Sequence, residues 1–146
     1  MYIVCMADIN LIQENSVFTW NWKNGDFELT QSLKPAVYMS IFCKKRAEAG
    51  LVENPFYREG DPVNEFYQNY EVGSLFWHCS KQKNTPQNAQ AMENAILEGL
   101  QWLIDDNLAS DIQVETSREQ NKLNINIQLT NTQTGIKENY DFFNIV

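Results

Sequence analysis

The residues best suited to chemistry in this 146-residue chain are one histidine and three cysteines. His78 stands next to Cys79, and a thiol beside an imidazole can act as a nucleophile with its base. Neighbours on a helix point about 100° apart, however, so we interpret the pair as packed or solvated. Cys5, Cys43 and Cys79 are odd in number, far apart and form no Cys-x-x-Cys pair. They indicate small apolar residues rather than a disulfide framework or a zinc site.

Paired carboxylates would allow glycoside hydrolysis, and the chain has 19 acidic residues. Glu98 and Asp105 share a predicted helix face but lie about two turns, or ~10 Å, apart along its axis. That exceeds the usual separation of catalytic carboxylates, although acids from separate segments could still converge. The chain has no phosphate-binding loop, no Gly-x-Ser-x-Gly and no His-Glu-x-x-His. We therefore predict no catalytic residues, no metal site, no cofactor and no enzyme activity.

Length and composition predict one globular domain over residues 1–146, since 43% of the residues are hydrophobic. The formal charge of −8 argues against nucleic acid as a partner, because phosphate backbones require a basic surface. No apolar run approaches the ~20 residues that cross a bilayer. The N-terminus lacks the basic start of a signal peptide, so we expect folding in the cytosol and no membrane partner.

The N-terminal part of the chain, up to residue 29, is predicted to form β-strands. Alternating apolar residues over positions 3–11 predict a first strand. Phe18, Trp20 and Trp22 alternate with polar residues up to Asn24-Gly25, the strongest short signal for a hairpin turn. Residues 27–29 continue beyond it, which predicts a β-hairpin with an aromatic face.

Helix signals follow. The first helix is expected over residues 33–49, with Ser32 as its cap and Pro35 in its first turn. Lys44, Lys45 and Arg46 should lie near its end, where the helix dipole favours cations. A short helix is expected over residues 74–82.

A long amphipathic helix should begin at Thr85-Pro86, an N-cap followed by proline. Asn107 is expected to end it in a left-handed conformation. We expect Trp102 and Leu103 to be largely buried against the sheet, and Trp77 to belong to the core as well. Trp102→Ala should then damage folding, whereas Asp105→Asn should not.

Residues 51–72 break the pattern with proline, glycine and aromatic residues. A loop of that length either binds a partner or packs by its own side chains. We keep both interpretations open. In the first, the interface residues are Phe56, Tyr57, Phe66 and Tyr67.

The C-terminal part predicts a three-stranded meander with polar outer faces, over residues 112–115, 123–129 and 136–142. Ile136, Tyr140 and Phe142 should share a face of its last strand. The predicted fold is α+β, an antiparallel sheet made of the N-terminal hairpin and this meander, packed on two or three helices. Tyr140, Phe142 and Phe143 could offer a partner an open strand edge, or the strand could simply close its own sheet.

Three blocks of sequence, in order, resemble the Mu-type phage family known as gene product 46. The first comprises residues 25–29 (GDFEL) and parts of 33–47, the second residues 73–77 (GSLFW) and 83–86 (KNTP), the third residues 100–109 (LQWLIDDNLA). Two departures stand out. Asn107 replaces a glycine common in the family, and residues 56–60 replace a Trp-rich, Gly-containing segment.

The resemblance implies a baseplate wedge protein of a contractile tail, related to the T-even gene product 25 from which the sheath begins. Such a protein would be assembled in the host bacterial cytoplasm and sit in six copies around the tube. It would contact larger wedge subunits, the sheath protein and the tail tube or hub. A lysozyme-like hydrolase and a tail-assembly chaperone or interaction module are the alternatives.

Overall fold

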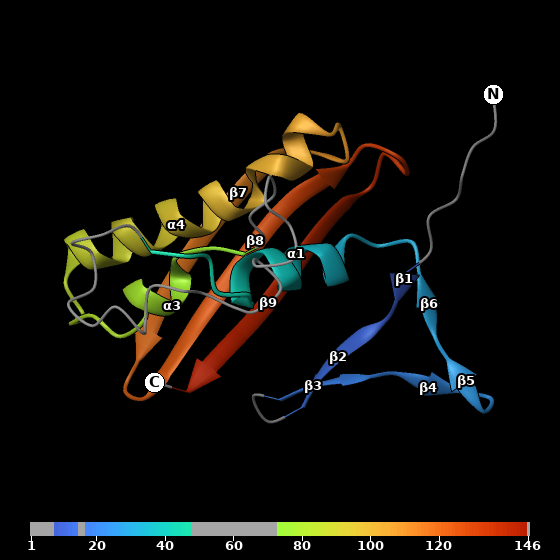
Figure 1. The fold of residues 1–146 in the computed structure, drawn as a ribbon, viewed down its shortest axis with the longest axis horizontal. Coiled ribbons are helices and arrows are strands. Elements are labelled where there is room, and N and C mark those ends of the chain that lie inside the picture. The colour runs from blue at the N-terminus through green and yellow to red at the C-terminus, as the bar shows by residue number, and fades with distance from the viewer. Residues whose placement is uncertain (1–7, 15–16, 48–72, 146) are drawn as a thin grey trace.

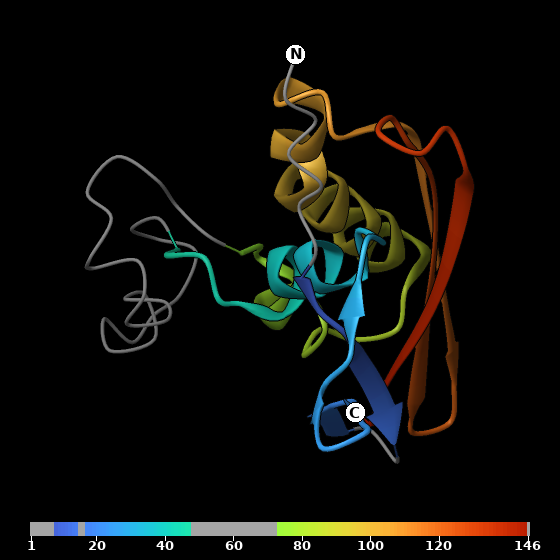
Figure 2. The same ribbon diagram turned by 90° about the vertical axis from the view of Figure 1, so that its right-hand side faces the viewer.

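The computed structural model describes residues 8–14, 17–47 and 73–145. Within these residues, helices lie on one face of a three-stranded antiparallel sheet and leave its other face uncovered (Figures 1 and 2). The helices are α1 (Lys34–Phe42), α3 (Phe76–Cys79) and α4 (Pro86–Asp105). The strands are β7 (Ala109–Glu119), β8 (Lys122–Asn131) and β9 (Lys137–Ile145), in the order β7-β8-β9. The α+β class and the C-terminal meander are confirmed.

Period-two alternation builds the inner face of this sheet. The inward positions of the central strand are filled by four buried aliphatic side chains: Leu123, Ile125, Ile127 and Leu129. On β9, Tyr140 and Phe142 face the same way and are also buried. Ile136 does not continue this face, because it precedes β9 in the connecting turn and is 61% exposed. The side chain of Glu138 takes the next inward position of β9.

The long helix α4 begins and ends on the signals that the sequence predicts. Thr85 is its N-cap, and the Thr85 hydroxyl accepts a hydrogen bond from the backbone N–H of Asn88 at 3.2 Å. Asn107 follows the helix with a φ of 56°. One face, comprising Met92, Ala95, Ile96, Leu100 and Leu103, is buried against the sheet and α1. No helix among the described residues has the length and apolar character needed to span a membrane.

The start of α1 differs from the prediction. Leu33 is the N-cap residue and its side chain makes no capping hydrogen bond, but the hydroxyl of Ser32 accepts from the N–H of Lys34, the first helical residue, at 3.4 Å. In addition, the backbone N–H of Leu33 donates to the carboxylate of Glu138 on β9 at 3.2 Å. A carboxylate beside a helix N-terminus is favoured by the unpaired N–H groups and the dipole there. One of the two acceptors at the start of α1 therefore comes from the sheet, 105 residues away in the chain.

The end of α1 also differs, because the helix stops at Phe42 and not near residue 49. Cys43 is extended, and its carbonyl accepts from Ser74 N–H at 3.0 Å. Lys45 N–H then donates to the Ser74 carbonyl at 3.1 Å, which forms a parallel bridge. The dipole explanation for Lys44, Lys45 and Arg46 is therefore wrong, since these residues lie beyond the helix.

The N-terminal part is an arm of three two-stranded ribbons rather than one hairpin (Figure 1). The pairs are β1 (Asp8–Ile9) with β6 (Leu29–Thr30), β2 (Leu11–Glu14) with β3 (Val17–Trp20), and β4 (Trp22–Lys23) with β5 (Asp26–Phe27). The predicted turn at Asn24-Gly25 is present, with φ values of 54° and 81°. Such a pair of positive φ values fits the primed turns of tight hairpins.

Candidate interaction surfaces

The residues that suggested nucleophilic chemistry are not arranged for it. The Cys79 thiol points toward the carbonyl of Ala91, with 4.0 Å between sulfur and oxygen. Burial raises the pKa of this thiol, which disfavours the reactive thiolate. His78 lies edge-on to the ring of Trp77 and 3.5 Å from the side-chain nitrogen of Gln82. The interpretation of a packed pair fits this geometry.

The two carboxylates of α4 that the sequence suggested as a pair bind different partners. Glu98 forms an ion pair with Lys45 at 3.1 Å, and Asp105 accepts from the Gln101 amide at 3.0 Å. Within the described part of the chain, no group of three or more His, Cys, Asp and Glu side chains could hold a metal ion.

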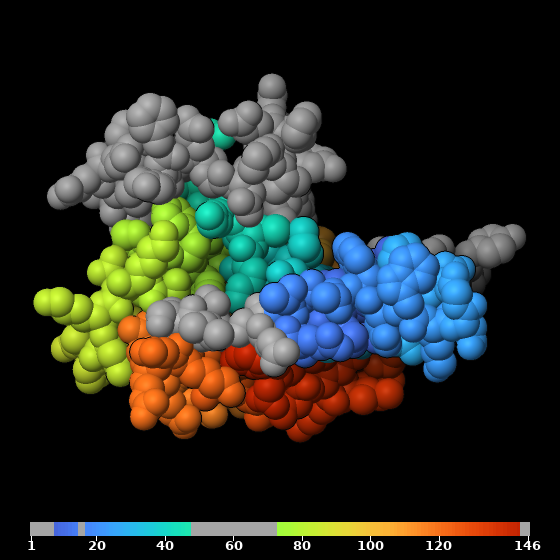
Figure 3. Space-filling view, turned by 90° about the horizontal axis from the view of Figure 1, so that it is seen from below, coloured from blue at the N-terminus to red at the C-terminus, as the bar shows by residue number. Residues whose placement is uncertain are grey.

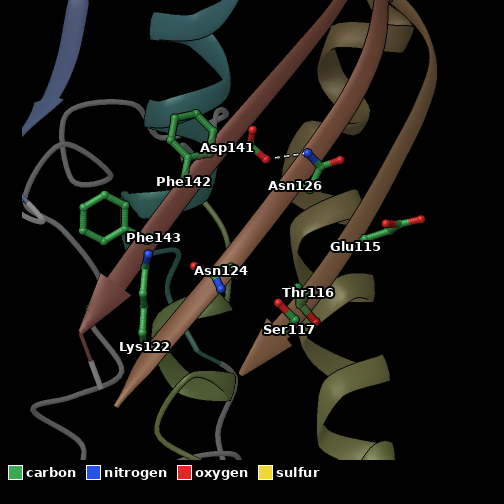
Figure 4. Close-up of a pocket in the computed structure, with 9 residues that line it drawn as sticks. All are labelled: Glu115, Thr116, Ser117, Lys122, Asn124, Asn126, Asp141, Phe142 and Phe143. Atoms are coloured by element: carbon green, nitrogen blue, oxygen red, sulfur yellow. Dashed lines mark hydrogen bonds between the residues drawn. The ribbon is translucent and has the colours of Figure 1, made fainter. Parts of the chain in front are cut away.

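The outer face of the sheet carries a shallow polar depression of about 340 Å³ (Figure 4). Glu115 on β7 and Asp141 on β9 stand on either side of Asn126, in register with it. Two strand spacings separate these two acids, roughly 10 Å between backbones. Both are exposed, and Asp141 accepts a 2.5 Å hydrogen bond from the Asn126 amide. A general acid for glycoside hydrolysis lies in an apolar site, whereas both of these acids lie on an open face.

The three residues expected in the core occupy different environments. Leu103 is fully buried. Trp102 is half-buried on the α1 side of α4, where its indole N–H donates to the Ser40 hydroxyl at 2.8 Å. The sequence predicts a ring largely buried against the sheet, whereas Trp102 is half-buried and packs against the edge of the core. Trp77 is also half-buried, its indole N–H donating to the Lys45 carbonyl at 3.1 Å, and its neighbour Phe76 supplies the buried ring.

Three helices meet where α4 carries Gly99. A Cβ at this position would lie 2.7 Å from the Ser74 Cβ and 2.9 Å from the Ser40 carbonyl oxygen. The Ser74 hydroxyl, which is buried, donates to the Ile41 carbonyl at 2.8 Å. The sequence gives no sign of this contact, because the residues that Gly99 meets lie on other elements.

Strand β9 closes the protein's own sheet. Tyr140 and Phe142 are 8% and 2% exposed, so their side chains face the core; the open strand edge predicted for them concerns the backbone and stays a prediction. Burial raises the pKa of Tyr140, and its hydroxyl donates to Glu138. Phe143 is half-buried on the opposite face, 4.7 Å from the ammonium group of Lys122.

The backbone edge of β9 is a separate feature. The side-chain amide of Gln13 donates to the Phe143 carbonyl at 2.7 Å and accepts from its N–H at 3.4 Å. The Phe143 peptide groups therefore point away from β8. Because these directions alternate along a strand, the peptide groups of Lys137, Asn139 and Asp141 point outward too. None of the described residues bonds to them.

The arm exposes aromatic rings. Trp20 and Trp22 are 53% and 62% exposed, and both contact the ring of Phe27. The proposed loop interface at Phe56, Tyr57, Phe66 and Tyr67 lies outside the described residues.

An open strand edge and exposed aromatic rings are surface features that contacts between proteins commonly use. The comparisons identify the family of this chain. Residues 33–135 match the family described as Phage protein GP46, and the chain belongs to this family. The Mu-like prophage FluMu protein gp46 of Haemophilus influenzae is 31% identical over 108 residues, which cover 68% of this chain and 74% of that protein. No solved structure matches the chain.

Proposed function

We propose that this phage protein is a structural component of a contractile-tail baseplate, where it links wedge subunits and initiates the sheath. Membership of the GP46 family is the observation that carries the proposal. The relation to the T-even gene product 25, which the resemblance to the gene product 46 family implies, supplies the role. The proposed partners are the larger wedge subunits, the sheath protein and the tube or hub, with six copies around the tube.

The position of the resembling blocks supports a structural role. Ser40 comes from the first block, Ser74 from the second, and Gly99 directly precedes the third. These residues meet at one junction of α1, α3 and α4. Trp102 of the third block donates to Ser40 of the first. The resembling residues therefore hold helices together, which is what a packing role requires and a catalytic role does not.

The experiment is to tag the protein in its phage, purify the finished particles and locate the tag by electron microscopy. We expect the tag at the baseplate, and particles without sheath when the gene is deleted. Absence of the protein from finished particles would point to an assembly chaperone. Lysis of peptidoglycan that is lost in Glu115→Gln and Asp141→Asn would point to a hydrolase. Either result would overturn the proposal.

The sheath joint can be tested on the open edge of β9. Deleting residues 139–146 is unsuitable, because it removes buried Tyr140 and Phe142. Asn139→Pro removes an outward N–H and keeps the hydrogen bonds to β8, a position where sheets tolerate proline. We expect a folded variant that enters baseplates but supports no sheath.

Asn139→Ala is the matched control, because it removes the same side chain and keeps the outward N–H, and sheath should still form on it. Normal sheath on Asn139→Pro baseplates would show that the joint lies elsewhere.

A further inference from the structure

The arm presents an aromatic cluster, defined here as Trp20, Trp22 and Phe27. The Phe27 ring centroid lies 4.2 Å from that of Trp22 and 6.2 Å from that of Trp20. The arm projects beyond the helices at one end of the molecule (Figure 3). Both tryptophans remain more than half exposed, although Trp is among the most costly side chains to leave in water. A contiguous exposed patch of this kind marks an interaction site more often than a scattered residue does.

A hydrogen-bonded junction holds the arm in shape. Asn10 N–H donates to the Glu28 carbonyl, Glu28 N–H to the Asn21 carbonyl, and Asn21 N–H to the Asn10 carbonyl, at 2.7–3.0 Å. The side-chain amides of Asn10 and Asn21 both donate to the Glu28 carboxylate. This closed ring fixes the three ribbons relative to one another. The cluster is thereby presented in one arrangement before binding, which lowers the entropic cost of docking.

The charges around the cluster indicate the chemistry of its partner. The arm carries four carboxylates, Asp8, Glu14, Asp26 and Glu28, against the single ammonium group of Lys23. Lys23 already lies 3.6 Å from Glu28. With a formal charge of −8 on the whole chain, a second copy would be repelled from this surface. A surface with lysine or arginine residues would be attracted to it.

We propose that the aromatic cluster docks another phage protein, whose contact surface is an apolar groove rimmed by lysine or arginine. Trp20 and Trp22 fill the groove, and the carboxylates of the arm face its rim. The arm precedes residues 33–135, the part that matches the family, and residues 25–29 within it belong to the first block that resembles the family. The inference does not depend on the baseplate role.

The test uses the full chain and the other structural proteins of the same phage, each purified separately, in pairwise binding measurements. We expect one of them to bind. Buried tryptophans commonly contribute 2 kcal/mol or more to an interface, so Trp20→Ala with Trp22→Ala should weaken that binding at least about 30-fold. Raising the salt concentration and the charge reversal Glu14→Lys should each weaken it as well.

Ile136→Ala is the control, since Ile136 is equally exposed but lies at the β8–β9 turn. Its affinity should match that of the unmodified protein. An unchanged thermal unfolding curve establishes that the double variant folds. If the double variant does not fold, the single variants Trp20→Ala and Trp22→Ala are measured in its place.

Four outcomes would overturn the proposal. The first is that no structural protein binds, and the second is that the tryptophan variants bind as well as the unmodified protein. The third is binding that neither salt nor Glu14→Lys weakens. The fourth is tryptophan-dependent association of the chain with itself or with a glycan array. Sedimentation of the unmodified chain alone and binding to the array supply the last of these. A partner that is absent from baseplates would contradict the proposed function but not this inference.

Discussion

At the scale of residues, Glu138 joins three parts of the chain. Its carboxylate accepts from Leu33 N–H at the start of α1, from the buried Asn131 amide at 3.2 Å, and from the Tyr140 hydroxyl. Asn131 in turn accepts from the N–H groups of Gln133 and Thr134, which shapes the β8–β9 turn. One acid therefore fixes a helix start, a buried amide and a turn together.

Glu138→Ala should lower the free energy of unfolding by about 1–3 kcal/mol, because it leaves half-buried donors without an acceptor. Urea denaturation followed by circular dichroism measures this. Glu115→Ala removes an exposed acid from the outer face of the same sheet and should stay within about 0.5 kcal/mol of the unmodified protein. Equal stability of the two variants would show that Glu138 has no structural role.

Glu28 makes the arm sensitive to acid. Hydrogen bonds from Asn10 and Asn21 hold the pKa of its carboxyl below the ordinary value of 4.5. A lowered pKa in the folded state means that ionised Glu28 stabilises the junction above pH 4.5, and that this stabilisation is lost as the pH falls through the lower value. Amide NMR signals of the arm should shift in that acid range, and Glu28→Gln should abolish the transition. A Glu28 carboxyl that titrates at or above 4.5 would contradict this.

At the scale of elements, the sequence predicts where a helix begins and ends when the residues that set those limits lie next to the helix in the chain. The limits of α4 follow from Thr85, Pro86 and Asn107, all adjacent to the helix. The limits of α1 follow only in part, because Glu138 joins Ser32 as an acceptor at its start and the bridge to Ser74 sets its end. Partners so far away in the chain leave no local signature. The aromatic face of the hairpin was likewise visible, but the three-ribbon junction was not.

Gly99→Ala tests the helix junction. Alanine favours a helix over glycine by up to about 1 kcal/mol. Its Cβ would nevertheless lie too close to Ser74 and the Ser40 carbonyl, and overpacking costs about 1–3 kcal/mol. We expect a lower melting temperature than for the unmodified protein. Asn94→Ala, on the exposed face of α4, should not lower it. A stabilised Gly99→Ala variant would mean that the three helices can move apart without cost.

At the scale of the whole molecule, a body that matches a phage family carries an arm outside that match. The arm packs its Phe18 ring on Tyr38, Phe42 and Phe142 of the body. It also brings Gln13 into hydrogen-bond contact with Phe143, near the C-terminal end of β9, and Figure 2 shows the arm beside the sheet. The edge of β7 is interrupted in another way, by a register shift between Ser110 and Gln113. Both edges of the sheet are thus modified, as natural sheets require to avoid pairing with other chains.

The arm should therefore limit self-association through β9. Gln13 satisfies the N–H and carbonyl of Phe143, so it occupies the position that a fourth strand would need. In Gln13→Ala the open edge no longer ends at Asp141 but extends to Phe143, while the contacts of Phe18 remain. Sedimentation velocity should then detect oligomers at concentrations where the unmodified protein is monomeric. Gln113→Ala, an exposed amide on β7, should stay monomeric. Adding Asn139→Pro to Gln13→Ala should restore the monomer, because proline blocks the same edge. Oligomers that persist in this double variant would show that they form through another surface.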